Sequence, residues 1–283
     1  MKRQQIILAS AGIVLLIALY FFGQTVPPAK NNRGVSGDQT VKAIDAQDIL
    51  QASKSKLTPS QLSYVNRVEN SVVRGDVKNQ QLNAYRQLAG FWKDSVKEGF
   101  LPFAYYTGEA AKLENSEKSL TFAAQLFLEN LREQDNPGLK SWMATEAKGL
   151  FEKALELNPN NDSLKVGLGA CYIFGSQARD AQEVMQGIQR ILEVSRRDSA
   201  NMYAQFMLGL GGVISGQLDK AAERLKRVAE HEPWNIEAVL TLAQIYEQKG
   251  NKDEAIKWYE AGKKLIRNPE VMEEIDKHIK SLQ

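Results

Sequence analysis

The sequence predicts an all-α protein. From Thr58 onward, apolar residues recur with the 3.6-residue period of amphipathic helices, and no stretch shows the sustained alternation of a β-strand. Short turn segments separate helices of similar length, so successive helices are expected to lie antiparallel. A separate apolar run close to the amino terminus predicts one membrane-spanning helix in front of this helical region.

Composition and charge narrow the function classes. The chain has 283 residues, of which 43% are hydrophobic and 25% charged, an ordinary globular composition. With 36 Lys+Arg against 34 Asp+Glu, it lacks the dense positive charge that binding to nucleic-acid phosphates requires. We therefore expect no nucleic-acid partner. Cys171 is the only cysteine, so no intrachain disulfide can form, and core packing is its expected role.

The apolar run covers residues 6–23 and reads IILASAGIVLLIALYFFG, without a charge. A bilayer core of about 30 Å needs roughly 17 to 25 such residues. Lys2 and Arg3 favour a cytoplasmic location for residues 1–5. The run exceeds the usual core of a signal peptide, about 7 to 15 residues, and no small-x-small pair closes it. An uncleaved anchor is therefore favoured over a cleaved signal peptide, with the rest of the chain outside the cytoplasm.

The region behind the apolar run divides into three parts. Residues 24–57 hold Pro, Asn, Gly, Ser and scattered charge, which predicts a flexible linker with one short helix near residues 43–52. A helical domain over 58–269 begins with Thr58 as N-cap, Pro59 at the first helical position and a capping box. Residues 270–283 are expected to form a capping helix with a polar outer face.

Apolar and small residues recur at fixed spacing in the helical domain. A small residue, a large residue four places later and then a proline occur as Ala147, Phe151 and Pro159, as Ala221, Leu225 and Pro233, and as Ala255, Tyr259 and Pro269. Nine residues after the first two prolines come Leu168-Gly169-x2-Tyr172 and Leu242-Ala243-x2-Tyr246, and Leu208-Gly209 precedes Leu242 by one further interval. These residues are expected to pack the helices together.

This spacing resembles the tetratricopeptide repeat, a helix-turn-helix unit of about 34 residues. The resemblance implies a right-handed superhelix with clear repeats at 162–201, 202–235 and 236–269 and degenerate repeats before them. It also implies that the small residues allow close approach of paired helices, and that the large ones fill the space between repeats. Six residues are inserted around Gly175 to Asp180, in the turn inside the first clear repeat.

The reactive side chains do not converge on a catalytic pattern. His231 and His278 lie in charged helical surroundings, where a solvated surface role is expected. The glycines from Gly209 to Gly216 neither follow a strand nor precede the Lys and Ser or Thr of a phosphate loop. The sequence therefore predicts no enzyme activity, no cofactor and no metal.

The resemblance implies binding of a protein or peptide in a groove lined by residues two and five places on either side of the Leu of each Leu-Gly pair. That rule selects Ser163, Val166, Ala170 and Ile173; Tyr203, Phe206, Leu210 and Val213; and Glu237, Leu240, Gln244 and Glu247. The predicted groove is apolar at its centre and lacks the Lys, Arg and Asn pattern of carboxylate-clamp members of the family, so such a clamp is disfavoured. The occupant could be an apolar helix, an extended peptide, the protein's own amino-terminal helices or a second subunit.

Together, the repeats and the anchor predict a scaffold or adaptor in the inner membrane of a bacterium, with a single pass and its carboxyl-terminal domain in the periplasm. An adaptor for cytochrome c maturation is an alternative that no residue specifically favours. A structural membrane protein that forms homo-oligomers, with a groove filled by its own helices or by a second copy, is the alternative from another class.

Overall fold

The computed structural model describes residues 44–74, 77–175 and 181–283, which are built of α-helices and contain no strand. Residues 1–43, with the expected cytoplasmic end, membrane helix and most of the linker, lie outside the described part. The helices are α2 Ala46–Lys54, α3 Pro59–Arg74, α4 Lys78–Ser95, α5 Phe100–Glu114, α6 Glu117–Leu131, α7 Pro137–Leu157, α8 Asp162–Gly175, α9 Ala181–Arg197, α10 Met202–Ile214, α11 Leu218–His231, α12 Ile236–Gln248, α13 Lys252–Lys263 and α14 Pro269–Leu282.

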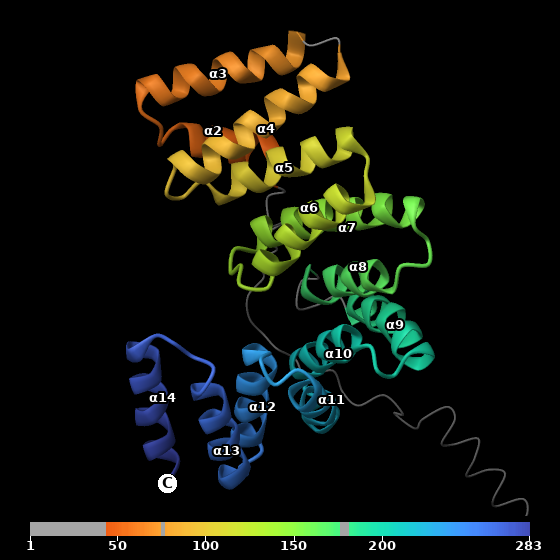
Figure 1. Ribbon diagram of the computed structural model, residues 1–283, viewed down its shortest axis with the longest axis vertical. Helices are drawn as coiled ribbons and strands as arrows, with labels where there is room; N and C mark the ends of the chain where they lie inside the picture. Colours follow the sequence, from red (N-terminus) through yellow and green to blue (C-terminus); the bar gives the residue numbers. More distant parts are fainter. Residues whose placement is uncertain (1–43, 75–76, 176–180) are drawn as a thin grey trace, which may run out of the picture. The chain divides into compact units, whose positions relative to one another are not determined.

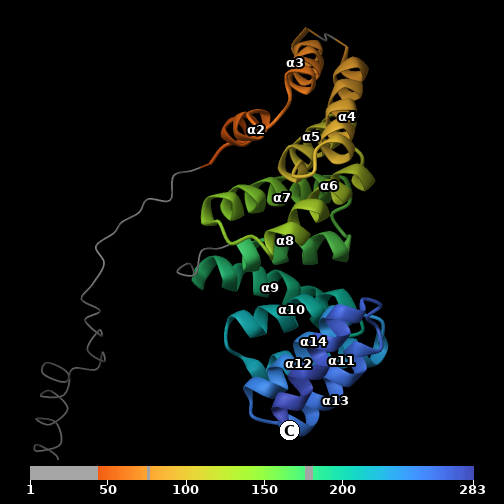
Figure 2. The same cartoon turned by 90° about the vertical axis from the view of Figure 1, so that its left-hand side faces the viewer.

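Successive helices pack as hairpins, and each hairpin packs against the next along the chain (Figures 1 and 2). The pairs are α4 with α5, α6 with α7, α8 with α9, α10 with α11, and α12 with α13. The expected units at 162–201, 202–235 and 236–269 each hold one such pair. The all-α prediction is thus confirmed for the described residues, which adopt a superhelical repeat fold. Among these helices, none has the length and apolar character needed to cross a membrane.

Asparagine caps and left-handed glycines set the ends of the later helices. Asn201, Asn235 and Asn251 each accept a hydrogen bond from the backbone N–H three residues ahead, at 2.9, 3.1 and 3.2 Å. Each bond satisfies one of the free amides in the first turn of a helix. Gly216 and Gly250 have φ angles of +72° and +74° in the turns inside two successive hairpins. Glycine adopts this left-handed conformation without strain, so a glycine at each position allows the tight turn between the two helices.

The capping box at the start of α3 forms as predicted. The backbone N–H of Gln61 donates to the Thr58 hydroxyl at 3.4 Å, and the Gln61 side-chain oxygen accepts from the Thr58 N–H at 3.0 Å. These reciprocal bonds satisfy two amides that would otherwise have no partner at the helix end.

At the end of the linker expected over residues 24–57, where a short helix was expected near residues 43–52, the structure has α2, which packs against the repeats. Ile49 on α2 is buried. The Lys54 ammonium donates to the Glu69 carboxylate on α3 at 2.5 Å, and the Tyr106 hydroxyl on α5 donates to the same carboxylate. Ahead of α2, Ile44 packs against Gly138 of α7, where an added Cβ would lie 2.7 Å from its Cδ1. Apolar burial and this shared carboxylate hold α2 against the repeats.

Small residues bring the paired helices into close contact. At Gly169 on α8, an added Cβ would lie 2.6 Å from Cγ1 of Ile191 and 2.8 Å from the carbonyl oxygen of Gly187. At Gly209 on α10, a Cβ would lie 2.7 Å from Cγ of Leu225. All three distances are shorter than ordinary van der Waals contact, so each helix pair approaches closely because a side chain is absent.

The residues expected to pack the repeats mostly lie in the core. The Phe151 ring lies against Gly167, so it fills the space between α7 and α8. Tyr172 and Tyr246 are half-buried, and Pro159 and Pro233 are exposed in the turns after α7 and α11. The buried members are Ala147, Phe151, Leu168, Gly169, Leu208, Gly209, Ala221, Leu242, Ala255 and Tyr259.

The carboxyl-terminal helix α14 closes the last hairpin. Its Ile279 and Leu282 are buried in a cluster with Ala255 and Tyr259 of α13. His278 and the Tyr259 hydroxyl both hydrogen-bond one oxygen of Glu247 at 2.8 Å. These bonds, His278 first, lower the pKa of the Glu247 carboxyl. Polar residues cover the rest of the helix, as expected for a cap, whereas Val271 remains 38% exposed.

We predict that Gly169→Ala destabilises the domain by about 1 to 3 kcal/mol, because its Cβ would meet a backbone oxygen that cannot rotate away. Gly149 on α7 is the matched control, since an added Cβ there meets nothing within 4 Å. Gly149→Ala should leave stability unchanged or raise it by up to about 1 kcal/mol. Urea unfolding of both variants tests this. Equal midpoints for the two would contradict the close contact between α8 and α9.

Candidate partner-binding face

The residues predicted to line a groove differ widely in exposure. On α8, Val166 and Ala170 are 0% exposed and Ile173 is 2% exposed. Phe206 and Leu210 on α10 are also buried, at 8% and 7%. Tyr203, Val213, Glu237, Leu240 and Glu247 are half-buried, and only Ser163 and Gln244 of the predicted set are exposed.

Packing against neighbouring helices explains this burial. Ile173 lies beside Gly187 of α9 and Gly211 of α10, at positions where an added Cβ would be 2.9 and 3.3 Å from its side chain. Leu240 lies over Gly262 of α13 in the same way. The positional rule thus selects residues that turn toward neighbouring helices. Of the four predicted residues on α8, Val166, Ala170 and Ile173 belong to the core and Ser163 is exposed, so α8 contributes no open apolar lining.

A single arginine joins the first helices of successive hairpins. We call the surface formed by α6, α8, α10 and α12 the first-helix face. Arg132, directly after α6, places its guanidinium carbon 5.4 Å from the ring centre of Phe174 on α8 and 5.9 Å from that of Phe206 on α10. The same guanidinium forms an ion pair with Glu237 on α12. Arg132 therefore contacts three helices that lie far from it in the sequence.

The surroundings of Arg132 are only partly hydrated. Its side chain is 22% exposed, whereas that of Glu237 is 42% exposed. Burial lowers the pKa of Arg132 and raises the pKa of the neighbouring Tyr203 hydroxyl. A cation stacked on aromatic rings at low hydration interacts strongly with them. Arginine and aromatic side chains are also the residues that most often dominate binding energy at protein interfaces.

Sequence reasoning did not identify Arg132. It stands just beyond the end of α6, outside the positions that the family rule selects, and its partners follow only from the stacking of the hairpins. The charge of Glu237 within the predicted set was one available signal, because a half-buried carboxylate requires a cationic or hydrogen-bonding partner.

The remaining reactive groups occupy structural positions. Burial raises the pKa of the Cys171 thiol, and its side chain is fully buried, as expected for a core residue. His231 hydrogen-bonds the carbonyl oxygen of Arg227 at 2.9 Å. The side chain of His278 is 43% exposed and bonds the carboxylate of Glu247 at the surface. Within residues 44–74, 77–175 and 181–283, no group of three His, Cys, Asp or Glu side chains could hold a metal ion.

Part of the carboxyl-terminal repeats matches a known family. Residues 213–271 match the tetratricopeptide repeat family. This span runs from the end of α10 through α13 to the start of α14. Among curated proteins, BBSome complex member BBS4 of Bos taurus is 33% identical over 101 residues, which are 36% of this chain and 18% of that protein. The chain thus matches only about a fifth of the length of this relative.

One solved structure of a tetratricopeptide-repeat protein shares the fold. A thermophilic TPR protein of Thermus thermophilus is 17% identical with a TM-score of 0.50, and the match covers 73% of this chain and 98% of that one. MamA of Desulfovibrio magneticus RS-1 is 21% identical with a TM-score of 0.42, covering 68% of this chain and 96% of its own. The Thermus structure supports the tetratricopeptide-repeat fold beyond the matched residues.

We predict that Arg132→Lys destabilises the domain by about 1 kcal/mol, because an ammonium keeps the charge but loses the planar stacking on Phe174 and Phe206. Arg227→Lys is the matched control. Its guanidinium also pairs with a carboxylate, that of Glu223, but lies on an exposed helix surface. That change should stay within about 0.5 kcal/mol. Chemical unfolding of both variants distinguishes the two positions, and equal effects would show that the stacking on α8 and α10 contributes no stability.

Proposed function

We propose that this chain is a non-catalytic scaffold that binds a protein or peptide partner on its first-helix face. The observation that carries the proposal is the stack of tetratricopeptide-type hairpins, in which Arg132 holds α8, α10 and α12 in place through Phe174, Phe206 and Glu237. These internal contacts fix the positions of the helices, and a surface whose side chains are held in place loses less entropy when it binds a partner. Exposed Gln244 and Ser163 lie on the same helices, so a partner can contact the edges of this face.

We further propose that residues 6–23 anchor the scaffold in the inner membrane of a bacterium, with the repeats on the periplasmic side. The support is the uncharged apolar run behind Lys2 and Arg3. This run has the length needed to span a bilayer, and cationic residues favour the cytoplasmic side.

Site-specific photocrosslinking in intact cells tests the binding face. A photoreactive phenylalanine analogue at Gln244 on α12 or at Ser163 on α8 should yield the same crosslinked partner. The control position is Glu223 on α11, a second-helix residue whose side chain is 75% exposed. It should yield no such product. A partner crosslinked equally from Glu223, or a product containing only two copies of this chain, would contradict the proposal.

Protease treatment tests the anchor and its orientation. Protease added to spheroplasts of cells that make the full chain should digest the repeats. Intact cytoplasmic markers in the same sample serve as the control. Protection of the repeats until the cells are lysed would place them in the cytoplasm and overturn the proposed topology.

A further inference from the structure

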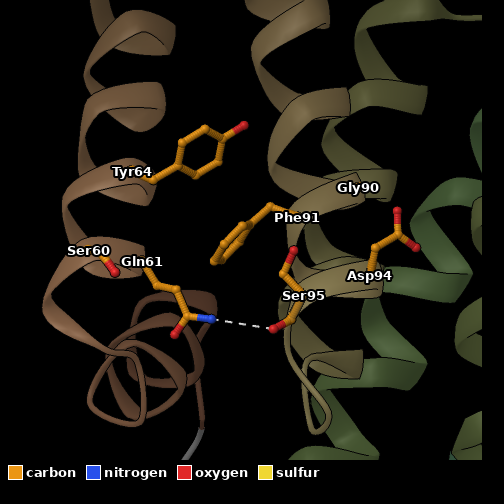
Figure 3. A pocket seen from close by; sticks show the side chains of 7 residues that line it. All are labelled: Ser60, Gln61, Tyr64, Gly90, Phe91, Asp94 and Ser95. Atoms are coloured by element: carbon orange, nitrogen blue, oxygen red, sulfur yellow. Dashed lines mark hydrogen bonds between the residues drawn. The ribbon is translucent and has the colours of Figure 1, made fainter.

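A cleft lies between α3 and α4, outside the first-helix face. It holds about 450 Å³ and is lined by Ser60, Gln61 and Tyr64 of α3 and by Gly90, Phe91, Asp94 and Ser95 of α4. Figure 3 shows Tyr64 and Phe91 pointing toward one another from the two helices, while Asp94 lies further around α4. The cleft therefore runs from an aromatic pair to a carboxylate.

The aromatic part of the cleft is ordered by contacts between its own side chains. The Tyr64 and Phe91 rings have centroids 5.2 Å apart at an interplanar angle of 37°. Gln61 donates to the carbonyl oxygen of Ser95 at 3.4 Å, which adds a second link between the two helices (Figure 3). The rings thus occupy defined positions at one end of the cleft.

Gly90 leaves the middle of the cleft open. An added Cβ at this position meets nothing within 4 Å, so no neighbouring side chain fills the space. Gly90 and Asp94 are four residues apart on α4, and Phe91 and Asp94 are three apart. Side chains with these spacings are neighbours on one helix face, about 5 to 6 Å apart at Cβ. A slender side chain lying over Gly90 could touch the Phe91 ring and reach Asp94.

The acidic end carries an uncompensated charge. Asp94 is exposed, and within the residues that the structure describes its carboxylate has no ion-pair or hydrogen-bond partner. The adjacent Lys93 instead places its ammonium 5.8 Å from the ring centre of Phe103 on α5. The chemistry of the cleft therefore favours a cation.

Among cations, a guanidinium fits best. It is planar, stacks on aromatic rings and offers paired N–H donors that match a carboxylate. The protein itself shows this preference, because the Arg67 guanidinium lies 5.5 Å from the ring centre of Tyr64. Arg67 does not line the cleft, so the space beside Phe91 remains available.

We propose that this cleft is a second binding site, which receives an arginine side chain of a protein or peptide partner. The aliphatic stem lies over Gly90, the guanidinium stacks beside Phe91, and its N–H groups donate to Asp94. The site is separate from the first-helix face, so the two can bind independently.

Saturation-transfer NMR on the detergent-solubilised full chain tests this site. The probe is N-acetyl-arginine N-methylamide, and the control is the citrulline analogue, which has nearly the same shape without the charge. The arginine probe should bind saturably with a dissociation constant of about 1 to 10 mM, as expected for one exposed side chain. Citrulline or lysine analogues that bind as tightly as arginine would overturn the proposal.

Three variants assign the binding to the cleft. Asp94→Asn should weaken binding about fivefold, the upper range for an exposed ion pair. Gly90→Leu should abolish it by filling the space over α4, whereas Gly149→Leu, at a glycine on α7 that is equally free of neighbours, should leave it unchanged. Thermal unfolding confirms that the variants fold. Unchanged binding in Gly90→Leu would rule out the cleft, and crosslinking from Gln244 in that variant reports separately on the first-helix face.

Discussion

Close approach of paired helices is the constraint on which this structure depends. Gly169 lies against a backbone oxygen of the facing helix, and Gly209 lies against Leu225, so neither position can hold a larger side chain without moving a helix. The distance between the two helices of each hairpin is thereby fixed, and each hairpin must fit the surface of the preceding hairpin. The positions of side chains contributed by distant helices follow from this fit, since packed interiors deform little.

The Arg132 cluster is a direct result of that stacking. Arg132 directly follows α6, and Phe174, Phe206 and Glu237 lie on α8, α10 and α12, so the four residues meet only when three successive hairpin contacts are correctly spaced. The Arg132 guanidinium lies over two aromatic rings and pairs with the carboxylate of Glu237. It therefore adds a polar, directional contact to an otherwise apolar surface. The first-helix face is therefore neither the purely apolar groove that the family rule suggests nor the multiply charged clamp that the sequence disfavours.

The hairpins could be predicted from the sequence because their signals are local and repeat along the chain. Leu242, Ala255 and Pro233 stand at regular intervals, and Asn235 could have marked the start of α12 through its preference for N-cap positions. The candidate binding face depends on contacts between distant helices, which a repeating sequence pattern does not predict. The ion pair of Arg132 joins distant parts of the chain, and the burial of Ile173 depends on two glycines in other helices. The sequence predicts the short helix α2 but not its packing against the repeats, because that packing depends on Glu69 of α3 and Tyr106 of α5 rather than on the nine residues of α2 itself.

The folded position of α2 also limits the reach of the scaffold. With the proposed anchor at residues 6–23, residues 24–43 connect the bilayer to the first residue that the structure describes. A fully extended peptide of that length spans at most about 70 Å. For a partner in the same membrane, such a tether raises the local concentration of binding sites far above that of a freely diffusing protein. A weak single contact, such as one arginine in a shallow cleft, can contribute measurably under those conditions.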